Sequence, residues 1–73
     1  MSNNANLTPR ELEVLAYLTE GKTNRQIATE LCIAEATVKA HLSAIYAKLH
    51  VSNRTEAALV GLDVLPMLRV YAS

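Results

Sequence analysis

Two helix starts of the same kind, close together in the chain, constrain its fold more than any other feature. They read TPRE and TNRQ, each a threonine followed three residues later by Glu or Gln. This pattern is a capping box, in which the two side chains satisfy backbone N–H groups at the start of a helix. Gly21, which lies between them, is suited to end a helix in the left-handed conformation. The sequence therefore predicts one helix over about 8–20 and a second over 24–31.

The connection after the second helix is very short. Only the letters CIA separate it from a third stretch of helical periodicity, over 35–49. Two helices joined so tightly must cross sharply, as in a helix-turn-helix, although an ordinary helical bundle gives the same pattern. One stripe of the third helix is apolar and is expected to face the core. This stripe consists of Val38, Leu42, Ile45 and Leu49.

A fourth helix is predicted over 53–65, capped by Ser52 and ended by Pro66. It carries two apolar stripes, whereas a surface helix of a monomer needs only one. The first stripe, expected to face the core, consists of Ala58, Leu59, Leu62 and Leu65. The second is predicted to form a homodimer contact and consists of Ala57, Val60, Gly61 and Val64. The alternative is that the second stripe packs beneath the C-terminal segment PMLRVYAS.

These elements indicate an all-α fold, a compact four-helix domain over residues 7–66. Residues 1–6 are predicted to be a polar linker or an artificial leader, and residues 67–73 a C-terminal tail. The chain has no Phe or Trp, so the core must be built from aliphatic side chains. No apolar run is long enough to span a membrane, and the single cysteine, Cys32, cannot form an internal disulfide. These features predict a cytoplasmic protein with Cys32 as a small buried hydrophobe.

Charge is unevenly distributed along the chain. The net charge is zero, which by itself argues against nucleic acid as a partner. Residues 22–54, however, hold a basic excess between two acidic flanks. The charged side chains in this segment are Lys22, Arg25, Lys39, Lys48 and Arg54 against Glu30 and Glu35. Because partner recognition responds to local potential, this segment is the place to look for an anionic partner.

The outward face of the third helix carries small side chains. A solvent-exposed helix face without a binding role usually carries Glu, Lys, Gln or Arg. The outward face here consists of Ala36, Lys39, Ala40, Ser43 and Ala47. Small groups allow the helix to approach a partner closely. In a DNA major groove a methyl side chain can pack on a thymine methyl, and lysine can donate to guanine O6 and N7. The alternative is an alanine-rich surface that serves helix formation alone.

Four pieces of the sequence stand in order: LTPRE, GKTNRQIA, ATVKAHLSAIYAKL and VSNRTEA. In this order and spacing they resemble the C-terminal DNA-binding domain of the LuxR/NarL/FixJ family of bacterial transcriptional regulators, from Leu7 to about Leu65. The resemblance implies that the second and third helices form a helix-turn-helix and that the fourth forms the dimer contact. It also implies sequence-specific binding of double-stranded DNA by a homodimer on inverted half-sites.

The resemblance implies roles for individual residues. The base-contacting positions of the family correspond to Lys39, Ala40 and Ser43. Its phosphate-contacting positions correspond to Asn24, Thr37, Lys48 and Arg54. Arg25, a basic side chain at the start of the second helix, is added to the phosphate set. The family also implies an upstream receiver or sensor domain, as in response regulators of two-component systems, no cofactor, and a place on the nucleoid.

The chain departs from the family pattern at three positions. Cys32 stands where glycine is usual in the turn, and Ala34 where a Ser or Thr N-cap is usual. His50 stands where glycine commonly follows the third helix. The missing cap costs about 1 kcal/mol. We therefore expect the start of the third helix to be less fixed in the free protein and to become ordered on DNA.

No catalytic or metal site is predicted, and the protein is not expected to be an enzyme. His41, His50 and Cys32 do not have the spacing of metal ligands. The sequence offers no recognisable oxyanion hole or buried carboxylate for a hydrolytic serine. Glu11 completes a capping box and is also placed to pair with Lys48 or Arg54.

Two other functions stay open from the sequence. A sigma-factor-like, promoter-reading helix-turn-helix shares the LTPRE and TVKAHL segments, although the SNRTEAALVGL segment after them favours the LuxR type. A helical protein-interaction module without DNA binding is favoured somewhat by the neutral net charge and the alanine-rich helix. Substitution of Lys39 by alanine distinguishes the two functions, because it should weaken DNA binding only if Lys39 contacts a base.

Overall fold

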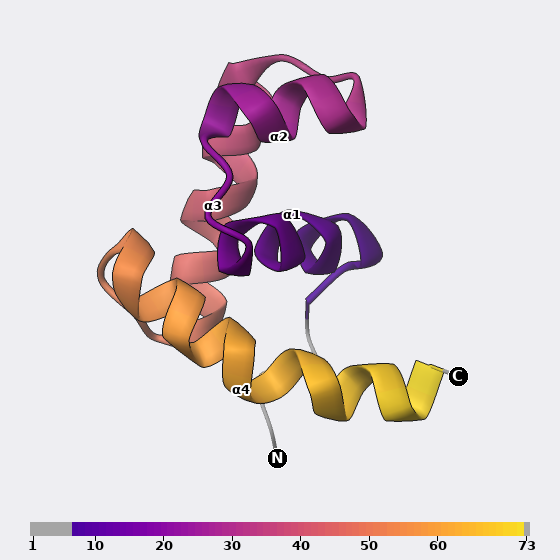
Figure 1. Ribbon diagram of the computed structural model, residues 1–73. Coiled ribbons are helices and arrows are strands. Elements are labelled where there is room, and N and C mark those ends of the chain that lie inside the picture. The colour runs from indigo at the N-terminus through magenta and orange to yellow at the C-terminus, as the bar shows by residue number, and fades with distance from the viewer. Residues whose placement is uncertain (1–6, 73) are drawn as a thin grey trace.

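The computed structural model describes the backbone of residues 7–72 and the side chains of residues 7–65. The predicted leader, residues 1–6, lies outside this part. The described backbone forms helices and no strand, as predicted: α1 (Pro9–Thr19), α2 (Asn24–Leu31), α3 (Glu35–Leu49) and α4 (Arg54–Ala72). Helix α3 runs from α2, at the top of Figure 1, down to the start of α4. Helix α2 packs against α3, and α1 packs against both α3 and α4.

The starts of α1 and α2 follow the predicted capping boxes. Thr8 Oγ1 accepts from the Glu11 N–H at 3.1 Å, and Glu11 Oε1 accepts from the Thr8 N–H at 2.9 Å. Thr23 and Gln26 make the equivalent pair of bonds at 3.1 and 2.8 Å. These short-range bonds satisfy the N–H groups that a helix start leaves without intrahelical acceptors, so each start is fixed locally.

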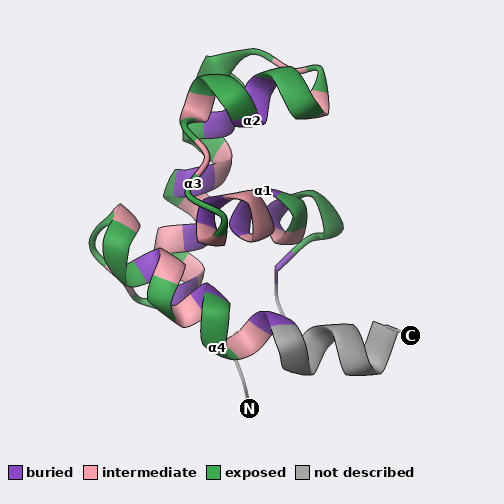
Figure 2. Cartoon of the chain, in the orientation of Figure 1, coloured by how far each residue is buried: buried purple, intermediate pink, exposed green. Residues whose placement is uncertain are grey.

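The core is aliphatic, as expected from the absence of Phe and Trp. Figure 2 shows the buried residues on the sides of the helices that face one another. Ile27 and Ala28 of α2 are buried in this core, and Leu31 packs against it partly buried. The apolar stripe predicted for α3 is buried in full. The buried apolar side chains of the described chain are Leu7, Val14, Leu15, Leu18, Ile27, Ala28, Val38, Leu42, Ile45, Leu49, Ala57 and Leu65.

Helix α4 differs from the prediction at both ends. It extends to Ala72, whereas the sequence predicted an end at Pro66. Proline removes one N–H hydrogen bond, but its fixed φ is helical, so a helix held on both sides can continue through it. The cap is Asn53 and not Ser52, because Asn53 Oδ1 accepts from the Glu56 N–H at 2.9 Å. Glu56 Oε1 in turn accepts from the Ser52 N–H at 2.7 Å.

The two apolar stripes of α4 differ in part from the prediction: Leu65 is buried as predicted, but two residues of each stripe change sides. Ala57 and Gly61 are buried within the chain, and a Cβ at Gly61 would lie 3.0 Å from Leu15 Cδ1 of α1. These two residues cannot form the predicted dimer contact, because both are buried within the chain, Gly61 against α1. Leu59 and Leu62, predicted to face the core, are instead 62% and 59% exposed. Within residues 54–65, the apolar surface that α4 leaves exposed is therefore on the side of these leucines.

The helix-turn-helix turn and the end of α3 both use residues with positive φ. Cys32 follows α2 and His50 follows α3, each with φ 59° in the left-handed region where glycine is favoured. The prediction that Cys32 is buried is wrong, since the residue is exposed. Its left-handed backbone lies in the turn between α2 and α3, where the side chain is outside the core. Ala34 makes no cap hydrogen bond at the start of α3, as its side chain dictates.

Candidate nucleic-acid interface

Helix α3 has a buried side and an exposed side. Val38 and Ile45 have no exposed surface, and Leu42 is only 5% exposed. On the other side of the helix, the predicted base-contacting residues are exposed. These are Lys39, Ala40 and Ser43. The outward face is thus open to a partner, and the side chains on it are short apart from the single lysine.

The start of α2 is suited to an anion. The first backbone N–H groups of a helix have no intrahelical acceptor, and the helix dipole places positive charge there. The first turn of α2 contains no acidic residue to cancel this charge. Asn24 is half-buried at the first position, and Arg25 is exposed beside it. A DNA phosphate is a fitting ligand for such a helix end.

Two predicted phosphate contacts are brought together by the fold. Arg54, at the start of α4, donates from Nη1 to Asn24 Oδ1 at 2.7 Å. Its Nη2 donates to the backbone carbonyl of Lys22 at 2.5 Å. Asn24 and Arg54 are 30 positions apart in the sequence, and no periodicity or capping signal predicts that they meet. The sequence reasoning therefore missed this contact.

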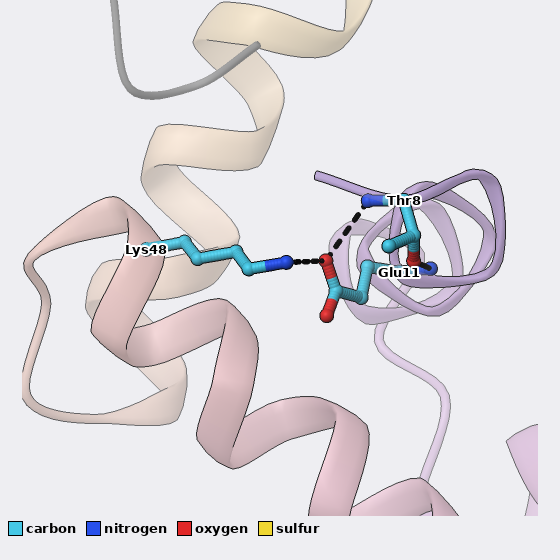
Figure 3. Close-up of polar contacts among 3 residues, drawn as sticks. All are labelled: Thr8, Glu11 and Lys48. Carbon is cyan, nitrogen blue, oxygen red and sulfur yellow. Dashed lines mark hydrogen bonds and ion pairs between the residues drawn. The ribbon is translucent and has the colours of Figure 1, made fainter. Parts of the chain in front are cut away.

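Lys48, a third predicted phosphate contact, makes an ion pair with α1. Its Nζ lies 2.7 Å from Glu11 Oε1, the same oxygen that accepts from the Thr8 N–H, as Figure 3 shows. Burial would raise the pKa of the Glu11 carboxyl, but the hydrogen bonds from Lys48 and Thr8 and the Lys48 charge together lower its pKa. Glu11 is therefore ionised at neutral pH and ties α3 to the capping box of α1. This pairing is one of the two that the sequence suggested.

The remaining predicted contacts differ in accessibility. Thr37, in the first turn of α3, is exposed and lies on the same helix as the base-contact candidates. Val60 and Val64, predicted for the dimer contact, are half-buried. Among the described residues, no three His, Cys, Asp or Glu side chains gather into a metal site. No helix in the described part of the chain is long and apolar enough to cross a membrane.

A short helix packed against a longer one through a tight turn, with the outer face of the longer helix left open, defines a helix-turn-helix domain. The family model described as "Bacterial regulatory proteins, luxR family" matches residues 5–60, and the chain belongs to this family. This membership confirms the resemblance and favours the LuxR type over the sigma-factor type.

Individual relatives agree with the family. The chain is 55% identical to the transcriptional regulatory protein LiaR of Bacillus subtilis over 53 residues, which are 73% of this chain and 25% of LiaR. It is 53% identical to the glycerol metabolism activator of Pseudomonas putida over 80% of this chain and 26% of that protein. The chain thus spans about a quarter of the length of these curated relatives.

Solved structures share the fold. The response regulator ChrA of a heme-sensing two-component system is similar over 78% of this chain and 28% of ChrA, with a TM-score of 0.74 and 51% identity. A structure of the anti-activator RapF with the DNA-binding domain of the response regulator ComA matches with a TM-score of 0.73 and 40% identity. This match covers 75% of this chain and 95% of the matched chain.

Proposed function

We propose that the chain binds double-stranded DNA sequence-specifically as the output domain of a longer bacterial transcriptional regulator, with α3 in the major groove. The exposed face of α3 carries this proposal, because its three central side chains are accessible while its opposite face is core. Lys39 donates to guanine O6 and N7. Ala40 and Ser43 bring the helix close to the bases and contact the neighbouring base edges.

Phosphate contacts hold the helix in this groove. Asn24 and Arg25 reach a phosphate from the positive end of α2. Thr37 and Lys48 contact phosphates of the DNA backbone from opposite ends of α3. With few polar side chains facing the bases, part of the specificity comes from the shape and deformability of the site. The basic excess of residues 22–54 supports this arrangement, since all four side chains lie in that segment.

A dimer on inverted half-sites completes the proposal. One α3 offers few base contacts, and two-fold pairing of domains doubles the recognised sequence. Helix α4 supplies the dimer contact through Leu59 and Leu62, the exposed large apolar side chains in its described part, flanked by the half-buried Val60 and Val64. Because the curated relatives are about four times as long as the matched segment, the proposal includes an upstream receiver or sensor domain. The proposed location of the protein is the cytoplasm, on the nucleoid. The domain acts by binding and not by catalysis.

Selection of bound sites from random duplex DNA tests these statements together. We expect one enriched sequence arranged as an inverted repeat. Lys39→Ala should weaken binding by about 1–3 kcal/mol and relax the preference at one base per half-site. Arg10→Ala, which removes an exposed cation from α1, is the matched control and should leave the selected sequence unchanged.

Three outcomes count against parts of the proposal. Absence of any enriched sequence contradicts DNA recognition and supports a protein-interaction module. An enriched sequence that Lys39→Ala leaves unaltered contradicts base reading by this lysine. Single half-sites without a repeat contradict the dimer.

A further inference from the structure

Arg54 bridges three segments of the chain. Its guanidinium extends from the first turn of α4 to Asn24 Oδ1, at 2.7 Å, and to the Lys22 carbonyl in the loop before α2. Hydrogen bonds from a charged donor are stronger than those between neutral groups. The start of α2 is therefore held to the start of α4 by one side chain.

No carboxylate pairs with Arg54 among the described residues; its guanidinium binds a side-chain amide oxygen and a backbone carbonyl instead. The positive charge of Arg54 thus adds to the positive end of α2 without being cancelled by an acid. This positive charge attracts a hydrogen-bond acceptor, such as an anionic oxygen, to the start of α2.

The bond to Arg54 decides which way the Asn24 amide points. A guanidinium has only N–H donors, so it can bind the amide oxygen of Asn24 and not its NH₂ group. The NH₂ group is then directed away from Arg54, and within the described chain it has no hydrogen-bond partner. A DNA phosphate oxygen is an acceptor, so it matches this NH₂ group and would be repelled by the amide oxygen.

From this geometry we infer that Arg54 is a positioning residue for DNA binding, which orients the Asn24 amide so that Nδ2 donates to a phosphate. The inference rests on the proposed function. It assigns Arg54 a role different from the direct phosphate contact that the sequence predicted, because the guanidinium acts here through Asn24. Asn24 is then the group that touches the DNA.

A double-mutant cycle separates the two roles. Binding to the selected duplex is measured for the wild-type chain, Arg54→Ala, Asn24→Ala and the double variant. We expect each single variant to lose about tenfold in affinity, and the double variant to lose no more than that. The matched control cycle combines Arg54→Ala with Thr37→Ala on α3, and its losses should multiply.

The salt dependence gives a second readout that a loss of folding stability does not move. The slope of log K against log salt is negative, and a direct phosphate contact by Arg54 requires its magnitude to fall by about 0.9 in Arg54→Ala. The positioning role predicts a slope that stays nearer the wild-type value. A fall of about 0.9, or losses that multiply in the Asn24 cycle, overturns the inference.

The wild-type chain provides a test that needs no variant. In a titration with the duplex, the ¹H and ¹⁵N resonances of the Asn24 side-chain amide should shift together with the backbone amide of Lys39. A shift at Lys39 without any change at the Asn24 side chain overturns the positioning role while DNA binding stands. No shift at either residue means that the proposed function itself has failed.

Discussion

Lys48 Nζ lies 2.7 Å from Glu11 Oε1, which joins α3 to the first turn of α1. Glu11 is only 6% exposed, whereas the Lys48 side chain is 32% exposed, so the ion pair is partly shielded from water. The same carboxylate caps α1 through the Thr8 N–H. One side chain thus sets the start of α1 and its attachment to the helix that carries the proposed base contacts.

Replacement of Glu11 by glutamine tests the contribution of this ion pair. Glu11→Gln keeps an oxygen for the Thr8 N–H but removes the carboxylate charge. We expect the free energy of unfolding to fall by about 1–2 kcal/mol, as for hydrogen bonds to charged groups, measured by urea denaturation. Glu13→Gln on the exposed side of α1 is the control and should leave stability unchanged. If the two substitutions changed the free energy of unfolding equally, the Glu11–Lys48 pair would contribute no more to stability than an exposed charge.

The Glu11 pair also predicts a pH dependence of stability. The pKa of the Glu11 carboxyl is lowered in the folded chain from its ordinary value of 4.5. The unfolded chain therefore takes up this proton first as the pH falls, which favours unfolding. The stability supplied by the pair is complete above pH 4.5 and is lost as the pH drops through the folded-state pKa. The difference between wild type and Glu11→Gln should shrink over this acid range, and a constant difference would contradict the prediction.

Ala34 predicts a stabilising substitution. Its backbone already has the extended conformation of an N-cap, with φ −75° and ψ 152°, but its methyl group cannot accept a hydrogen bond. Ala34→Ser should raise the free energy of unfolding by about 1 kcal/mol. Slower amide exchange at the start of α3 in the free protein should accompany it. Ala36→Ser, inside the first turn, offers no cap and should give no such gain; matching gains would refute the capping explanation.

Gly61 tests the observed orientation of α4. An added Cβ would lie 2.7 Å from Thr19 Cγ2 and 3.0 Å from Leu15 Cδ1, so either these side chains must shift or α1 and α4 must move apart. Gly61→Ala should lower stability by about 1–3 kcal/mol despite the better helix propensity of alanine. Leu62→Ala, on the exposed side, should leave the stability of the monomer nearly unaltered in thermal unfolding. The opposite ranking would restore the predicted orientation, in which Gly61 faces outward.

The sequence could predict the parts of the fold that depend on neighbouring residues. The capping boxes at Thr8 and Thr23 fixed two helix starts because their bonds span three residues. The stripe of α3 was assigned correctly because its opposite side is nearly free of large apolar groups. Pro66 was misleading, since the proline removes one backbone hydrogen bond but the helix continues past it.

The orientation of α4 could not be deduced in this way. The sequence pattern does not show which of two apolar stripes at helical spacing faces the core. That depends on which stripe packs better against α1. Gly61 fits there because it lets Leu15 approach closely, a contact between residues far apart in the chain. The contact between Arg54 and Asn24 escaped prediction for the same reason, although both residues were selected as phosphate contacts.

On α3, the residues that form the core and the residues proposed to contact the bases do not overlap. Val38, Leu42 and Ile45 pack inward, while Lys39, Ala40 and Ser43 have no packing role to lose. Substitutions at the latter positions can therefore change which base edges are read and leave the scaffold intact. Because stability and base contact depend on different side chains of α3, this helix is a starting point for engineering new operator preferences.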